Sequence, residues 1–363
     1  MIGITALVYA LTGIYKPCIM LFYNALLHFL SVLFLIKLLS NYNIDKKFAI
    51  LGSFPLAFSP SSLIWTSQIH RDGLYILGFL SIFLAISYIS KRALKPLFYS
   101  IILQTFGLFL IYLARTHMIL PLKYIFSILF LLAFLLLILK IVKLLDENSI
   151  VDKFTLKKFT ILSLSIAITA NFLLLQHELQ TQTQIQIQIQ TQIQTLKWER
   201  ELFVPEKLDK ILYRIAEWRY KFLNEYFKDA KGNIEKNFIP QKASDFLFYL
   251  PRGLFVGLFY PTPNFWFKEG GTICGTIARA VIPMETIVLW IGVISLFFAL
   301  RNFQNKISIF IILLVCLMFI YLHVVTEPNL GSIVRKRYVF INTITAFSYS
   351  YYAKRISLWL KKR

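Results

Sequence analysis

The chain has 363 residues, of which 57% are hydrophobic and 16% charged, and its formal net charge at pH 7 is +21. Soluble domains are about 45–50% apolar and about 25% charged, so this composition excludes a water-soluble enzyme domain and indicates a membrane protein. The Lys and Arg residues gather in short loops and at the C-terminal end, which favours orientation in a membrane over binding to nucleic acid.

Apolar stretches long enough to cross a bilayer recur along the chain. A membrane-crossing helix needs about 20 predominantly apolar residues. Residues 1–15 are short for a span and count only as a candidate. We predict an all-α polytopic membrane protein of about nine to ten transmembrane helices. The nine clear spans are about Pro17–Ser40, Phe48–Thr66, Gly73–Ser90, Leu97–Ala114, Met118–Leu145, Leu156–Leu175, Ala280–Leu300, Ile307–Val325 and Tyr338–Ala353.

The distribution of Lys and Arg over alternate loops predicts which side of the membrane each loop faces. One set of loops, together with the C-terminal end, holds more than twice as many of these residues as the other set. The richer set is therefore expected on the cytoplasmic side. The opposite, outer side receives His70–Asp72, Arg115–His117, the long insert and Thr326–Arg337. Most of the ionisable groups that could take part in binding or catalysis are thus expected on the outer side of the membrane.

This arrangement divides the chain into three regions. An N-terminal transmembrane region covers 1–175, with a turn at 67–73 on the outer face. An outer-face insert covers 176–279, and a C-terminal transmembrane region covers 280–363.

The outer-face insert has three parts of different character. Residues 180–195 form a Gln-rich repeat with a period of two, which we interpret as a loosely ordered insertion without a catalytic part. Residues 208–227 carry apolar side chains at helical spacing beside basic ones, which predicts an interfacial helix on the outer leaflet. Residues 246–267 are aromatic and broken by three prolines, which predicts a re-entrant or interface-hugging segment.

The turn at 67–73 is the first candidate site. His70, Arg71 and Asp72 lie there between two apolar runs, and ionisable groups in such a position are costly and usually functional. Asp72 is the candidate catalytic residue, as a general base or a metal ligand. The alternative is a carboxylate that pairs with an arginine to lower the cost of its charge. His70 and Arg71 are candidate substrate-binding residues.

Five arginines are expected at the outer membrane boundary, the depth at which a lipid phosphate lies. The guanidinium is a planar fork of donors that matches phosphate oxygens. One such arginine alone is better explained by snorkelling, but five against the charge bias favour a phosphate site. Glu285 at the head of one span and Glu327 at the end of another are candidate substrate-binding acids. The five arginines are Arg71, Arg115, Arg252, Arg335 and Arg337.

Four sequence motifs occur in a characteristic order along the chain. They are Asn24 with FSPSSLIWTSQIHRDGL, then LARTHM, then LPRGLFVGLFYPTPNFW with Glu285, then EPNLGSIVRKRYVF. The set resembles the bacterial polytopic glycosyltransferases of the GT-C superfamily, in the broad group of dolichyl-phosphate-mannose–protein mannosyltransferases. The resemblance implies a helical fold in the bacterial inner membrane with its site on the periplasmic face. It implies a polyprenyl-phosphate sugar as donor and a glycan, lipid or protein as acceptor. Arg71 and Asp72 are then assigned to the site, and Arg335 and Arg337 to the lipid phosphate.

The sequence departs from that superfamily at its N-terminal end. The superfamily has a catalytic acid in the first outer loop, after an initial span, and residues 1–15 resemble the end of that loop. Three explanations stay open: a misplaced start codon, a decayed and inactive gene, or Asp72 acting alone. No cofactor is assigned, and a divalent metal ion over the phosphates is left open.

Two other functions stay open at this point. An O-antigen-type polymerase or ligase would also place arginines in outer loops. A transporter would place ionisable residues at mid-span and show an inverted repeat. We find only His28 and His323 within spans and no repeat, which makes transport the weaker alternative.

Overall fold

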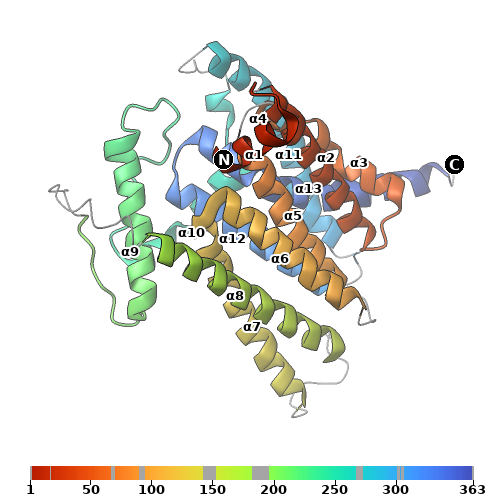
Figure 1. Ribbon diagram of the computed structural model, residues 1–363, viewed down its shortest axis with the longest axis horizontal. Coiled ribbons are helices and arrows are strands. Elements are labelled where there is room, and N and C mark those ends of the chain that lie inside the picture. The colour runs from red at the N-terminus through yellow and green to blue at the C-terminus, as the bar shows by residue number, and fades with distance from the viewer. Residues whose placement is uncertain are drawn as a thin grey trace. The chain divides into compact units, whose positions relative to one another are not determined.

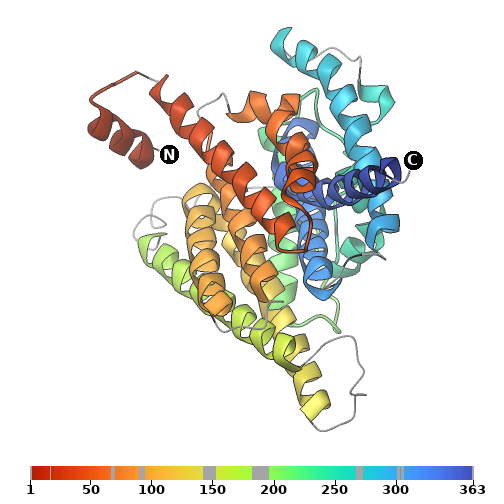
Figure 2. The same ribbon diagram turned by 90° about the vertical axis from the view of Figure 1, so that its right-hand side faces the viewer.

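The computed structural model describes residues 2–16, 18–66, 70–89, 95–141, 153–181, 196–266, 273–300, 303 and 306–361. Within these ranges the regular secondary structure is helical, apart from one isolated bridge between Asn233 and Asn329 (Figures 1 and 2). The predicted all-α class is confirmed. The helices are α1 (Ile2–Thr12), α2 (Ile19–Ser40), α3 (Lys46–Phe58), α4 (Pro60–Thr66), α5 (Asp72–Ile89), α6 (Lys95–Arg115), η1 (Thr116–Met118), α7 (Ile119–Ile141), α8 (Lys153–Thr181), α9 (Glu206–Lys221), η3 (Phe222–Tyr226), α10 (Ala243–Phe259), η4 (Pro263–Phe265), α11 (Ile273–Ala299), α12 (Lys306–Thr326) and α13 (Leu330–Leu360).

Among the described residues, six helical stretches are long and apolar enough to cross a membrane, as expected for a polytopic membrane protein. One of them, Lys95–Ile138, is a 44-residue stretch that runs through α6, η1 and α7. The sequence predicted two spans over this stretch. The other five stretches are Ile19–Ser40, Asp72–Ile89, Leu156–Leu175, Val281–Ala299 and Ile307–Thr326.

Three predicted apolar segments are not among these six stretches. Helix α1 has 11 residues, which is short of the bilayer thickness. The predicted span 48–66 is divided between α3 and α4, because Ser59 precedes Pro60 and adopts an extended backbone. The predicted span 338–353 lies within α13, which carries a series of buried polar side chains. These are Asn342, Thr343, Thr345, Ser348 and Ser350.

Packing divides the chain into two compact units. Unit 1 comprises Met1–Ile189, Phe297–Val315 and Ala346–Arg363, and unit 2 comprises Gln190–Leu296 and Cys316–Thr345. Helices α11, α12 and α13 therefore each contribute residues to both units.

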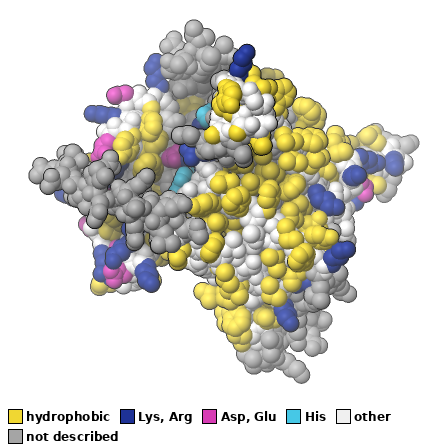
Figure 3. Space-filling view, viewed as in Figure 1, with side chains coloured by type: hydrophobic (Ala, Val, Ile, Leu, Met, Phe, Trp, Pro, Cys, Tyr) yellow, Lys and Arg dark blue, Asp and Glu magenta, His cyan; other side chains and the backbone are white. Residues whose placement is uncertain are grey.

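Helix α5 forms the core of unit 1. Every residue of α5 except Tyr88 is buried, and the helix packs against α2 and α6 (Figure 1). A Cβ on Gly107 would lie 2.6 Å from the carbonyl oxygen of Gly78, so these two glycines allow the backbones of α5 and α6 to approach closely. Large apolar side chains remain on the outside of the unit, including Phe22 and Phe98. Figure 3 shows hydrophobic side chains spread over much of one face of the molecule. Such a surface suits contact with lipid rather than with water.

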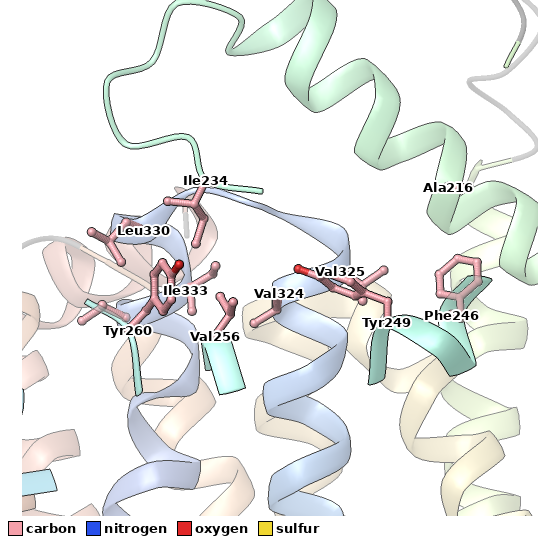
Figure 4. Close-up of a cluster of buried hydrophobic side chains, with 11 residues drawn as sticks. Ala216, Ile234, Phe246, Tyr249, Val256, Tyr260, Val324, Val325, Leu330 and Ile333 are labelled. Atoms are coloured by element: carbon pink, nitrogen blue, oxygen red, sulfur yellow. The ribbon is translucent and has the colours of Figure 1, made fainter. Parts of the chain in front are cut away.

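Unit 2 is built around a cluster of buried side chains from α9, α10, α12 and α13, including Ala216, Val256, Val324 and Ile333 (Figure 4). Helix α10 lies close to α12, because a Cβ on Gly257 would lie 2.3 Å from the Ile320 side chain. Small residues at such contacts let two helices pack tightly in a membrane protein.

The three predicted parts of the insert have different outcomes. The predicted helix 208–227 is present as α9 and the single π-helical turn η3, so its helical periodicity is confirmed. Most of the predicted segment 246–267 is helical rather than broken, because α10 continues through Pro251 and ends only at Phe259. Residue 267 and nearly all of the repeat 180–195 lie outside the described residues, as do residues 67–69 of the predicted turn.

Candidate functional site

The start of α5 and the end of α6 meet in unit 1 through an ion pair. Asp72 is the first residue of α5, and Arg115 is the last residue of α6. Arg115 Nη2 donates to Asp72 Oδ1 at 2.6 Å, and the two side chains are 12% and 8% exposed. A carboxylate at a helix N-terminus and a guanidinium at a helix C-terminus both interact favourably with the helix dipole. The pair joins two motifs that are 43 residues apart in the sequence.

This ion pair bears on the two interpretations of Asp72. The carboxylate is paired with an arginine, as in the structural alternative, although the partner is Arg115 and not its sequence neighbour Arg71. A carboxylate oxygen that already accepts a guanidinium N–H is less available to take a proton from an acceptor hydroxyl. The side chain of Arg71 is exposed and that of His70 is half-buried. The catalytic role of Asp72 stays a prediction.

Arg219 on α9 is the most extensively bonded cation described in unit 2. Its side chain is fully buried and donates to four backbone carbonyls. Nε bonds to Phe238 at 2.6 Å and Nη2 to Glu235 at 2.9 Å. Nη1 bonds to Val324 at 2.9 Å and to Val325 at 3.0 Å. Burial lowers the pKa of Arg219 to about 10, which still leaves the guanidinium charged at neutral pH.

Arg219 was not among the predicted site residues, although the sequence contains one signal for it. Leu212, Ile215 and Phe222 mark an apolar stripe on the predicted helix, and Arg219 falls on that stripe. A charge on a buried helical face needs polar partners, because burial without them is costly. Here the partners come from the 235–238 loop and from the end of α12.

The loop held by Arg219 forms one wall of a pocket in unit 2. The pocket is a shallow depression open to solvent, with a volume of about 560 Å³. The rings of Phe238 and Tyr249 stack in it with centroids 3.7 Å apart. Its lining residues are Glu235, Lys236, Asn237, Phe238, Tyr249 and Arg252. Aromatic, cationic, amide and carboxylate groups therefore converge on one site.

An ion pair crosses this pocket. Arg252 Nη2 donates to Glu235 Oε1 at 2.7 Å and to the Tyr260 hydroxyl at 3.2 Å. The bond to Glu235 raises the pKa of Arg252, so the guanidinium is charged. Arg252 is half exposed, and its five N–H donors exceed these two bonds. Glu235 itself has a φ of 50°, a left-handed conformation that costs a non-glycine residue about 1–3 kcal/mol. Its carbonyl bond to Arg219 and its carboxylate bond to Arg252 hold it there.

Glu327 is bonded to side chains of α13. Its carboxylate accepts hydrogen bonds from the Ser332 hydroxyl and from the Lys336 ammonium group. The predicted substrate-binding acid is therefore already bonded to a cation of its own motif.

The remaining predicted residues of unit 2 lie on α11 and α13. Arg337 is buried and donates to the Gly257 carbonyl of α10 at 2.5 Å, and it interacts electrostatically with Glu285. Arg335 is half-buried on α13. Residues two apart on a helix do not share a face. Binding of one phosphate by both Arg335 and Arg337 stays a prediction. The bond to Gly257 shows that Arg337 holds α13 against α10.

Among the described residues, no group of three or more His, Cys, Asp or Glu side chains could hold a metal ion.

Comparisons with protein families, with curated proteins and with solved structures found no match to this chain. The likeness to GT-C enzymes thus rests on the sequence motifs, and function must be argued from the two ion pairs and the pocket.

Proposed function

We propose that this chain is a membrane glycosyltransferase that takes a hexose or pentose from a polyprenyl-phosphate donor on the outer face of a bacterial inner membrane. The acceptor is a glycan, lipid or protein of the cell envelope. The proposal extends to the finer fold, a GT-C-like arrangement with nine to ten spans. The observation that carries it is the pocket in unit 2 that contains Arg252 and Glu235.

The position of the pocket suits a lipid-linked donor. Arg219 ties the 235–238 loop of the pocket to the carbonyls of Val324 and Val325, which lie at the end of the candidate span Ile307–Thr326 and so at a membrane boundary. The phosphate of a polyprenyl donor lies at that boundary, while its prenyl chain stays in the bilayer.

The chemistry of the lining residues suits a phosphorylated sugar. Arg252 and Lys236 supply positive charge for a phosphate, and a guanidinium matches phosphate oxygens in a two-point contact. Glu235 and Asn237 supply oxygen acceptors for sugar hydroxyl groups. The pocket therefore has a group for each polar part of the donor.

The charged side chains of the pocket have different roles in the transfer reaction. The bond between the anomeric carbon and the phosphate oxygen breaks, and the acceptor oxygen bonds to that carbon. The departing polyprenyl phosphate gains negative charge, which Arg252 stabilises more strongly than the charge of the bound donor. The acceptor hydroxyl gives its proton to a carboxylate. Glu235 is the carboxylate nearest to Arg252; one of its oxygens accepts the Arg252 N–H, so its other oxygen takes the proton. The alternative that the sequence motifs supply is a separate site around Asp72 in unit 1.

The test is sugar transfer in membranes that contain the full chain. Membranes are supplied with polyprenyl-phosphate sugars carrying a radioactive sugar, and label in the glycan, lipid and protein fractions is measured. We expect transfer by the full chain, a loss of about 100-fold or more in Arg252→Ala, and little change in Arg214→Ala. Arg214 is a matched control, because it is an exposed arginine of the same insert.

Two results would contradict the proposal. If Arg252→Ala and the unchanged chain transfer sugar equally well, the pocket takes no part in the reaction. If the chain is correctly inserted and transfers sugar from none of the donors, it is not a glycosyltransferase.

A further inference from the structure

Unit 1 contains a second pocket, of about 450 Å³, that the glycosyltransferase proposal does not use. Tyr42, Phe303 and Tyr351 supply aromatic walls, and the rings of Phe303 and Tyr351 have centroids 5.7 Å apart. Lys354 and Arg355 of α13 supply two positive charges. Among the described residues that line this pocket there is no Asp or Glu. The site is therefore basic and aromatic.

The ends of candidate spans place this pocket at a membrane boundary. Tyr42 comes two residues after the span Ile19–Ser40 ends. Phe303 lies between the spans Val281–Ala299 and Ile307–Thr326. Two separate span ends thus meet at one pocket, at the depth of lipid headgroups. The distribution of Lys and Arg predicts that these loops and the C-terminal end are cytoplasmic.

The two cations are placed to bind an anion. Arg355 Nη1 donates to the Tyr351 hydroxyl at 2.8 Å, which orients the guanidinium beside the aromatic wall. A guanidinium has five N–H donors, so this single bond leaves donors for a phosphate. Basic pockets beside transmembrane helices on the cytoplasmic side are a known type of site for anionic lipid headgroups.

The end of α13 distinguishes a lipid from a soluble phosphate. Ile356, Leu358, Trp359 and Leu360 are 51–60% exposed directly beside the cations. Apolar side chains next to basic ones are typical of a helix that lies in the membrane interface. A soluble anion would gain nothing from these side chains, whereas the acyl part of a lipid would cover them.

We propose that this pocket binds the phosphate headgroup of an anionic phospholipid, with Lys354 and Arg355 as its ligands. The aromatic walls and Leu358 then contact the glycerol part of the lipid. The bound lipid fixes the end of α13 against the turn between α2 and α3.

The test uses the full chain, purified in detergent and stripped of lipid. Binding of phosphatidylglycerol and of phosphatidylcholine is measured by native mass spectrometry and by the rise in unfolding temperature. We expect phosphatidylglycerol to bind the unchanged chain more tightly than phosphatidylcholine. A pocket variant, Lys354→Gln with Arg355→Gln, should bind phosphatidylglycerol about tenfold or more weakly.

A matched control removes the same charge from the same side of the membrane. Lys46→Gln with Lys47→Gln changes two lysines at the start of α3 that do not line the pocket, and we expect less than about a twofold effect. Leu358→Trp keeps both pocket cations and fills the space, so it should also weaken binding even if the charge variant fails to fold.

Three results would overturn the proposal. Equal losses in the pocket and control variants would mean that only the general charge attracts lipid. Displacement of phosphatidylglycerol by inorganic phosphate at comparable concentration would identify a soluble phosphate as the ligand. Equal binding of the two lipids would mean that the pocket does not recognise an anion.

Discussion

Two arginines, the partly buried Arg115 and the fully buried Arg219, show how differently the two units accommodate charge. In unit 1, Arg115 is paired with a carboxylate, Asp72, and both lie at the helix ends that suit their charges. In unit 2, Arg219 bonds to four backbone carbonyls. The first arrangement is a contact between two helix ends. The second joins a helix, a loop and the end of another helix, so one side chain determines the shape of a pocket.

The difference is also one of sequence distance. Asp72 and Arg115 are 43 residues apart, and their helices are consecutive. Arg219 and Val324 are 105 residues apart. We infer that removal of Arg219 disrupts the fold of unit 2 more than removal of the Asp72–Arg115 pair disrupts unit 1.

The largest expected effect is that of Arg219→Met. The change keeps the length of the side chain but leaves four carbonyls without their donor, two in buried bonds and two in partly buried bonds, at about 1–3 kcal/mol for each buried one. We expect unit 2 to lose about 4 kcal/mol or more of unfolding free energy. Proteolysis of residues 196–266 during thermal unfolding measures this loss.

Two further variants sharpen the result for Arg219. Arg219→Lys should recover little stability, because an ammonium group cannot reproduce the planar set of donors. Arg214→Met on the exposed side of α9 should change the unfolding free energy by less than about 0.5 kcal/mol. A loss of less than about 1 kcal/mol in Arg219→Met would show that its carbonyl contacts do not hold the loop.

A smaller effect is expected for the ion pair of unit 1. Asp72→Leu or Arg115→Leu should each cost about 3 kcal/mol, because either change leaves one buried charge without its partner. The double variant should cost less than the sum of the two, because it removes both charges. Additive losses in unfolding measurements would argue that the two side chains do not stabilise each other.

The smallest effect on stability is expected for Glu235→Gln. Its partner Arg252 is half exposed, so loss of the ion pair should cost less than about 1 kcal/mol. Sugar transfer should nevertheless fall sharply if Glu235 takes the acceptor proton. If Glu235→Gln transfers normally and Asp72→Asn does not, the base lies in unit 1.

The sequence predicted those parts of the fold that depend on neighbouring residues. The apolar runs around α2, α5 and α12 predicted helices whose bounds agree with those observed to within two residues, whereas α8 and α11 extend six to seven residues beyond their predicted runs. The break before Pro60 and the helix through Pro251 were not predicted, because a proline either ends a helix or is tolerated within it according to its surroundings. Residues 338–353 were predicted as a span from their apolar side chains, and the burial of the polar side chains between them on α13 was not predicted.

The candidate site was predicted less completely than the fold. The sequence identified Asp72, Arg115 and Arg252 as charges that needed an explanation, but it did not identify their partners. Glu235 and Phe238 had no local pattern to mark them, because they line the pocket only through the bonds of Arg219 and Arg252. Long-range contacts of this kind leave no periodic signal in one sequence.

We propose that the pocket containing Arg252 and Glu235 binds the phosphate and sugar of a lipid-linked donor. The most direct test is photocrosslinking of the full chain in bilayers with a polyprenyl-phosphate sugar that carries a photoreactive group on the sugar. Sites of crosslinking are then mapped by mass spectrometry. We expect labelling between residues 235 and 252 that is lost in Arg252→Ala and retained in Arg214→Ala. Labelling confined to the region of Asp72 and Arg115, or equal labelling by a polyprenol without phosphate, would contradict the claim.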